Sequence, residues 1–157
     1  MHISFALFAD AANISQEGKL NVLGVFDAVQ VGALPAMHPR ATLVVRLKAT
    51  RDDLGTHALG LSWINPRGAE LWTSNGEVNV GAPPPHVLEM DLPIVAAIDL
   101  PIDQPGAFLM RITLAGQVAA EVPLQVSTAG PAARAVVPGG GGLGGGLGGG
   151  IGGGMVS

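Results

Sequence analysis

The stretch Thr42-Leu43-Val44-Val45-Arg46-Leu47-Lys48-Ala49-Thr50 shows the pattern that decides the fold. Every second residue from Leu43 to Ala49 is apolar, whereas Arg46 and Lys48 point to the opposite side of an extended chain. A period of two residues is typical of a β-strand with one face in a core and the other in water. We therefore predict a strand over residues 42–50, with its two cations on a solvated sheet face.

The same alternation recurs between turn signals along the first 128 residues, and no segment has a convincing helical stripe. Strands are expected over residues 2–9, 19–31, 42–50, 57–64, 70–80, 87–93, 108–114 and 118–126. Asn65-Pro66-Arg67-Gly68 is a specific turn signal, and the three prolines of residues 81–86 predict a surface crossing. The fold class is therefore all-β, an antiparallel two-sheet sandwich of seven or eight strands, immunoglobulin-like in organisation.

For two of the expected strands, the sequence also bears on their position in a sheet. Residues 19–31 are apolar on both faces, with Leu20, Val22 and Phe26 against Leu23, Val25 and Val29, and this predicts a central strand. If the strand of residues 42–50 lies at an edge, Arg46 and Lys48 would guard it against uncontrolled pairing.

The amino-acid composition argues against several classes of function. Only 13% of the residues are charged, with 8 Lys and Arg against 12 Asp and Glu, so a basic surface for nucleic acid is not expected. The chain has no cysteine, which excludes disulfides, thiolate metal sites and cysteine nucleophiles. The short apolar N-terminus lacks the cations of a signal peptide, and no stretch is long enough for a membrane span. We expect a cytoplasmic protein.

The composition changes sharply near Pro138. Residues 139–154 contain 13 of the 24 glycines, and from residue 143 to residue 155 every fourth residue is large and apolar, namely Leu143, Leu147, Ile151 and Met155. Each glycine would cost a helix about 1 kcal/mol relative to alanine, so a coil is expected in water. We divide the chain into a β-sandwich domain, residues 1–128, and a linker with a Gly-rich tail, residues 129–157.

Two segments resemble a known family. Ser4–Asn13 followed by Glu17–Asp27 resembles the opening of an uncharacterised bacterial family of small β-sandwich proteins, with the pattern F-A-L-x-A-D-A-A-N … G-K-L-N-x-L-G. Pro105-Gly106-Ala107-Phe108, Gly116 and Glu121–Leu124 resemble its closing hairpin. The resemblance covers about residues 3–126. It implies a sandwich fold and carries no assigned activity.

A cluster of polar residues surrounds the first predicted connection: Asp10, Asn13, Lys19 and Asn21. They could form a polar ligand pocket. In the structural interpretation, which we favour, Asp10 and Asn13 bond backbone amides of a turn and Lys19 pairs with Asp10 or Glu17.

Other polar residues give weaker signals of a site. Asp52, Asp53, Asp99 and Asp103 fall in predicted loops, and sandwiches can bind calcium between loops, but no single loop supplies the oxygens that calcium needs. Glu89 and Asp91 share a strand face, where a solvated role is expected over acid–base chemistry. The four histidines are scattered and have no ligand spacing. No catalytic residue, metal or cofactor is predicted.

Trp63 and Trp72 flank the Asn65–Gly68 turn close to cross-strand register. One is expected in the core, and a second, exposed indole would mark a contact surface. Together with the apolar tail residues, the tryptophans are the candidate interaction residues. We predict a non-enzymatic binding or assembly module that uses a protein partner or self-association, with the tail as a tether. The alternative is a small-ligand or calcium-binding domain, or an enzyme, that uses the loop carboxylates.

Overall fold

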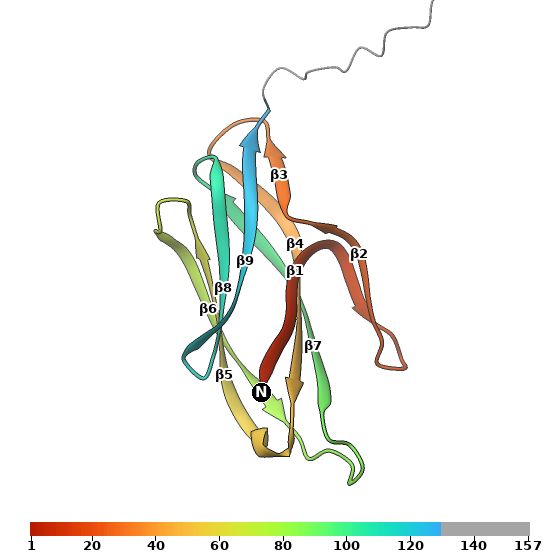
Figure 1. Cartoon of the computed structure of the whole chain (residues 1–157). Helices are drawn as coiled ribbons and strands as arrows, with labels where there is room; N and C mark the ends of the chain where they lie inside the picture. The colour runs from red at the N-terminus through yellow and green to blue at the C-terminus, as the bar shows by residue number, and fades with distance from the viewer. Residues whose placement is uncertain (130–157) are drawn as a thin grey trace, which may run out of the picture.

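The computed structural model describes residues 1–129, and in this part of the chain two β-sheets pack face to face (Figure 1). One sheet has four strands in the order β2-β1-β4-β7, and the other has five in the order β3-β9-β8-β5-β6. The predicted all-β, two-sheet sandwich is confirmed. The tail residues Leu143, Leu147, Ile151 and Met155 lie outside the described residues.

The described strands number nine, against the seven or eight predicted. Their bounds are β1 (His2–Ile14), β2 (Leu20–Phe26), β3 (Ala28–Val31), β4 (Ala36–Ala49), β5 (Gly55–Ile64), β6 (Glu70–Val80), β7 (Met90–Ile102), β8 (Gly106–Leu114) and β9 (Gln117–Thr128). A 3-10 helix, η1 (Arg51–Asp53), joins β4 to β5. All pairs are antiparallel except β3 with β9, which is parallel.

The prediction of one central strand over residues 19–31 is wrong. The chain breaks at Asp27 and changes sheet, so that β2 is an edge of the four-stranded sheet and β3 is an edge of the five-stranded sheet. The backbone oxygen of Asp27 accepts a hydrogen bond from the Gln125 amide at 2.8 Å, which fixes the crossing. Residues 19–31 are apolar on both faces because the segment changes sheet and because one face of β2 is exposed. The segment is not buried on two sides.

Arg46 and Lys48 do not lie on an edge strand. Strand β4 lies between β1 and β7, so the two cations cannot guard a free edge. Leu43, Val45 and Leu47 of the same strand are at most 1% exposed and face the core. The cations occupy the opposite, outer face, as the alternation predicts.

Two prolines lie in β7, the strand at the other edge of this sheet from β2. Strand β7 begins at Met90 and continues through Pro93 and Pro101 to Ile102, well beyond the predicted end at residue 93. Because proline lacks an amide hydrogen, it is tolerated in a strand whose outer side is unpaired. In the described residues β7 pairs only with β4, which satisfies this condition.

The core lies between the sheets and is built around three aromatic side chains. Trp63, Phe8 and Phe108 are fully buried. Trp63 stacks on Phe108 with ring centroids 5.0 Å apart and meets Phe8 edge-on at 6.1 Å. The Trp63 indole nitrogen donates to the Pro101 oxygen at 2.8 Å, so the polar edge of the largest core side chain is satisfied.

The predicted turn at Asn65–Gly68 forms, and a second tight turn connects β8 to β9. At Asn65–Gly68 the Gly68 amide donates to the Asn65 oxygen at 2.9 Å, and Gly68 takes a φ of 83°. Ala115 and Gly116 have φ values of 49° and 79° and connect β8 to β9, which is the two-residue turn that suits the twist of a hairpin.

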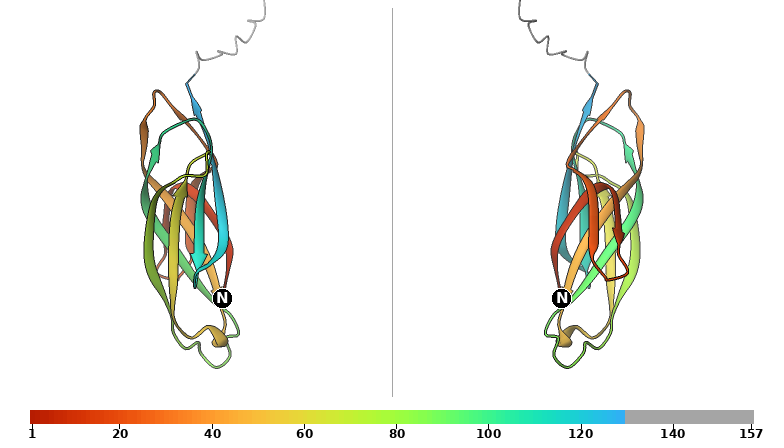
Figure 2. Two further views of the ribbon diagram at one scale, coloured as in Figure 1. Left: turned by 90° about the vertical axis from the view of Figure 1, so that its left-hand side faces the viewer. Right: turned by 90° about the vertical axis from the view of Figure 1, so that its right-hand side faces the viewer.

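Strand β1 changes partner half-way along its length. Its first half pairs with β4 as far as Ala9, and its second half pairs with β2. Residues 10–26 therefore form a two-stranded arm, which lies against the outer face of the four-stranded sheet (Figure 2, right). The arm explains why Val44, which faces away from the core, is nevertheless fully buried.

Candidate interaction surfaces

The predicted polar cluster is spread along the arm. The Asn21 amide donates to the Asn13 side-chain oxygen at 2.9 Å across the β1–β2 pair, and Lys19 forms an ion pair with Glu17 at 2.5 Å. The Asp10 carboxylate lies over Gly24, where a Cβ would approach it to 2.2 Å. Of the two partners predicted for Lys19, Asp10 and Glu17, only Glu17 pairs with it. The contacts hold the arm together and are exposed. Asn13 and Asn21 line one hollow of the arm, whereas Asp10 and Lys19 line two others, so the four residues do not converge on a single pocket.

The arm leaves a cavity of about 390 Å³ above the outer face of the sheet. Phe5, Leu20 and Val22 line its apolar part, and the ion pair of Arg46 with Asp91 closes the opposite wall. Lys19 also lines this cavity, and its amine pairs with Glu17, so both cations of the cavity wall already have a carboxylate partner.

Four charged residues form a network on this outer face. Arg46 binds both carboxylate oxygens of Asp91, at 3.2 and 2.6 Å, and Lys48 pairs with Asp91 at 2.5 Å and Glu89 at 3.2 Å. The hydrogen bonds from Arg46 and then Lys48 lower the pKa of Asp91, and those to Asp91 and then Glu89 raise the pKa of Lys48. Arg46 and Lys48 of β4 are therefore neutralised by Asp91 of β7 and by Glu89, the residue just before β7.

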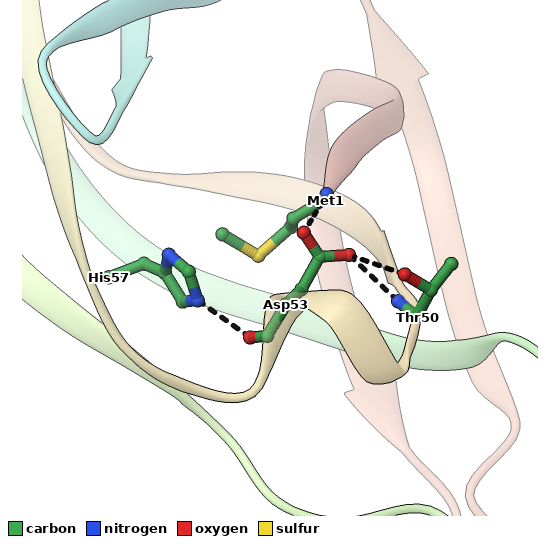
Figure 3. Close-up of polar contacts among 4 residues, drawn as sticks. All are labelled: Met1, Thr50, Asp53 and His57. Atoms are coloured by element: carbon green, nitrogen blue, oxygen red, sulfur yellow. Dashed lines mark hydrogen bonds and ion pairs between the residues drawn. The ribbon is translucent and has the colours of Figure 1, made fainter.

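A second polar cluster ties the N-terminus to η1 (Figure 3). The Met1 ammonium pairs with one oxygen of Asp53, and the Thr50 amide and hydroxyl donate to the other oxygen at 2.8 and 3.1 Å. The bond with the ammonium and then the Thr50 amide lower the pKa of Asp53 to about 2. A ring nitrogen of His57 lies 2.7 Å from the Asp53 backbone oxygen. Every group has a structural partner.

The other candidate carboxylates are separated. Asp99 accepts the Arg40 amide at 2.8 Å, and Asp103 accepts the Asn65 side-chain amide at 2.8 Å. Within residues 1–129, no three His, Asp or Glu side chains gather in a way that could hold a metal ion.

The two tryptophans are direct cross-strand partners. Both therefore face the inside of the sandwich, and the fully buried Trp63 takes no part in a surface. Trp72 is partly buried against the core. Its indole nitrogen is inaccessible to solvent and has no hydrogen-bond partner in the described part of the chain. Neither side chain is the exposed indole that would mark a contact surface.

The most exposed apolar strand residues lie instead on the arm, in β2. Leu23 is 72% exposed and Val25 is 61% exposed. Strands β2 and β3 run consecutively along one side of the sandwich, which we call the β2/β3 side, and neither contains a charged residue or a proline. Sheet edges are normally protected by such residues. The β2/β3 side lacks this protection.

The opposite side, formed by the edges of β6 and β7, is protected. Strand β6 carries Glu70 and Glu77, and β7 carries two acids in addition to its two prolines. Between these edges lies a hollow of about 630 Å³, which we call the β6/β7 hollow. Its apolar lining comes from both sheets: Ile14, Leu59, Val78, Leu92, Pro93 and Ile94.

Small residues at inward positions of β6 create the β6/β7 hollow. Trp72 faces inward, and by strand alternation so do Ser74, Gly76 and Val78. Ser74 and Gly76 are too small to cover Leu59, which is the cross-strand partner of Gly76. A Cβ at Gly76 would meet nothing within 4 Å. The hollow was not among the predicted sites, although a serine and a glycine at inward positions of a strand are a sequence signal for it.

Comparison with known proteins places the chain in a family. A model of a family of unknown function, DUF6941, matches residues 4–127, which include all or part of each of the nine strands. The chain belongs to this family. The match agrees with the expected uncharacterised family and leaves the activity open. No curated protein matches the chain. In residues 1–129, no helix is long and apolar enough to cross a membrane.

Proposed function

We propose that the protein is a non-enzymatic binding and assembly module whose contact surface is the β2/β3 side of the sandwich. The observation that carries the proposal is the exposure of Leu23 and Val25 on an edge without charge or proline. An exposed apolar edge of this kind is a template for association with another chain. A second copy is the partner that we propose.

The polar groups support a binding role over catalysis. The cations of β4 are paired with Asp91 of β7 and with Glu89 just before it, and Asp53 is held by an ammonium and by Thr50. An enzyme would need a concave site in which reactive groups converge with perturbed pKa values. The described pKa shifts come from ion-paired hydrogen bonds and, for Asp53, also from the hydrogen bonds that Thr50 donates. We also propose that residues 139–157 act as a tether and that the protein is cytoplasmic. The bacterial origin of the family and its immunoglobulin-like organisation stay predictions.

A matched pair of charge substitutions tests the surface. Val25 and Val118 are similarly exposed, at 61% and 58%, but Val118 lies at the start of β9, away from the β2/β3 side. We expect Val25→Lys to shift light scattering at micromolar concentration toward the monomer and Val118→Lys to leave the association unchanged. Equal effects of the two variants, or a monomeric parent protein with no partner, would contradict the proposal.

A further inference from the structure

The β6/β7 hollow has the size and the lining of a site for a small molecule. Its volume of about 630 Å³ lies within the range of roughly 300–1,000 Å³ that is common for ligand pockets. Such pockets are mostly apolar and carry a few polar groups that orient the ligand. The lining of the hollow is mainly apolar, and it reaches Leu59 on the inner side of the sandwich because Gly76 leaves that side chain uncovered.

Three elements border the hollow, which makes it a pocket between strands rather than a simple strand edge. Strands β6 and β7 form two walls, and the tip of the β1–β2 arm forms the third with Ile14 and Gly18. Gly18, Asp91 and Pro93 also line the cavity of about 390 Å³ beneath the arm. The two spaces therefore adjoin, and they leave room for an elongated apolar molecule.

The charges around these two spaces favour a ligand of one sign. The Lys19 amine pairs with Glu17, which is equally exposed at the arm tip. The Arg46 guanidinium pairs with Asp91. A charged ligand that used any of these groups would have to displace an existing partner. Glu77 also lines the hollow, but it forms no ion pair within residues 1–129. The unpaired charge of the lining is therefore negative.

We propose that the β6/β7 hollow binds a small amphiphilic cation, with its apolar body between the sheets and its ammonium group at the Glu77 carboxylate. By strand alternation Glu77 points outward, so the carboxylate lies at the mouth of the hollow and stays in water. Burial of the apolar body supplies most of the affinity, and the exposed ion pair adds a preference for positive charge. The hollow and the β2/β3 side lie on opposite sides of the sandwich, so this site adds to the proposed assembly function and does not depend on it.

Three probes with the same chain length and different charge test the site in the full-length protein: octylamine, 1-octanol and octanoate. In calorimetric titrations at neutral pH and low salt, we expect octylamine to bind about threefold more tightly than 1-octanol and about tenfold more tightly than octanoate, as attraction and repulsion by one exposed charge allow. Both ratios should shrink at high salt. Equal affinities for the three probes, or no binding of octylamine, would overturn the proposal.

A matched pair of substitutions tests the contact with the ammonium group. Glu77→Gln should lower the affinity for octylamine to that for 1-octanol and leave the affinity for 1-octanol unchanged. Glu70→Gln is the control, because Glu70 lies on the same strand and does not line the hollow, and it should keep the preference for octylamine. A preference that survives Glu77→Gln, or that is lost equally in both variants, would overturn the assignment of the ammonium group to Glu77.

Two further pairs of variants test the location of the apolar body. Gly76→Leu should prevent binding of all three probes, because its side chain occupies the hollow, whereas Gly81→Leu should not. A Cβ at Gly81 also meets nothing within 4 Å, and Gly81 does not line the hollow. Ile14→Ala should weaken octylamine binding about threefold, since it removes apolar contact at the arm tip. Leu23→Ala, on the same arm and outside the hollow, should leave it unchanged.

The location is wrong if octylamine binds to Gly76→Leu or to Ile14→Ala as it does to the parent protein. Ile14 is 46% exposed, so its truncation keeps the test open even if Gly76→Leu fails to fold. Val25→Lys should bind octylamine as tightly as the parent protein, because the assembly surface is separate. If Val25→Lys abolishes association and octylamine never binds, the proposed function stands and only this inference falls.

Discussion

Replacing each tryptophan in turn by phenylalanine distinguishes the environments of Trp63 and Trp72, which look equivalent in the sequence. Trp63 is fully buried and donates a hydrogen bond to Pro101, whereas the buried indole nitrogen of Trp72 has no partner in residues 1–129. Trp63→Phe removes that hydrogen bond, at a cost of about 1 kcal/mol. It also leaves a cavity where the larger ring had been, at a further cost of about 1–2 kcal/mol. Trp72→Phe loses some apolar contact but removes an unsatisfied donor, and these effects should nearly cancel.

We therefore expect Trp63→Phe to lower the free energy of unfolding by about 2–3 kcal/mol, which for a domain of this size corresponds to roughly 8–12 °C in melting temperature. Trp72→Phe should change it by less than about 1 kcal/mol. Each variant keeps a single tryptophan, so urea unfolding can be followed by its fluorescence. Equal losses in the two variants, or a larger loss for Trp72→Phe, would refute the assignment of their environments.

Three other predictions concern pH, a turn and metal. Because the pKa of Asp53 is lowered to about 2 from 3.8, its charged form stabilises the fold above about pH 4, and this contribution is lost as the pH falls through 2. The melting temperature of Asp53→Asn should thus lie below that of the parent at pH 6 and converge with it near pH 2. Ala115→Asn should stabilise the domain by about 0.5–1 kcal/mol in urea unfolding, because asparagine accepts the positive φ of the turn more readily than alanine. Calcium or a chelator should leave the melting temperature unchanged, and a rise of several degrees with calcium would favour the alternative of a loop-carboxylate site.

Local sequence patterns predicted the existence of most strands because their causes are local, although β4 and β7 extend well beyond the predicted residues 42–50 and 87–93. Alternation over residues 42–50 and 70–80 reports which side chains of a strand face water, and this follows from backbone geometry alone. The turn at Asn65–Gly68 depends on the φ preferences of proline and glycine within four residues. Predicting these features therefore requires no knowledge of which strand lies beside them.

The interaction surfaces could not be predicted in this way. The β2/β3 side exists because the chain changes sheet at Asp27, and the alternation of residues 19–31 is the same for a buried strand and for one that crosses between sheets. The exposure of Leu23 and Val25 depends on the arm folding back over its own sheet. Such an arrangement is set by contacts between residues far apart in the chain.

The sequence by itself determined that this protein is a cysteine-free, weakly charged β-sandwich with a Gly-rich tail, since composition and a two-residue period are properties of the chain. Only the tertiary structure decided that Arg46 and Lys48 are paired on a central strand, that Trp63 is core, and that Gly76 opens a hollow over Leu59. The physical reason is that a side chain's environment depends on which strand lies beside it. Strand order comes from packing across the whole domain and not from any local segment.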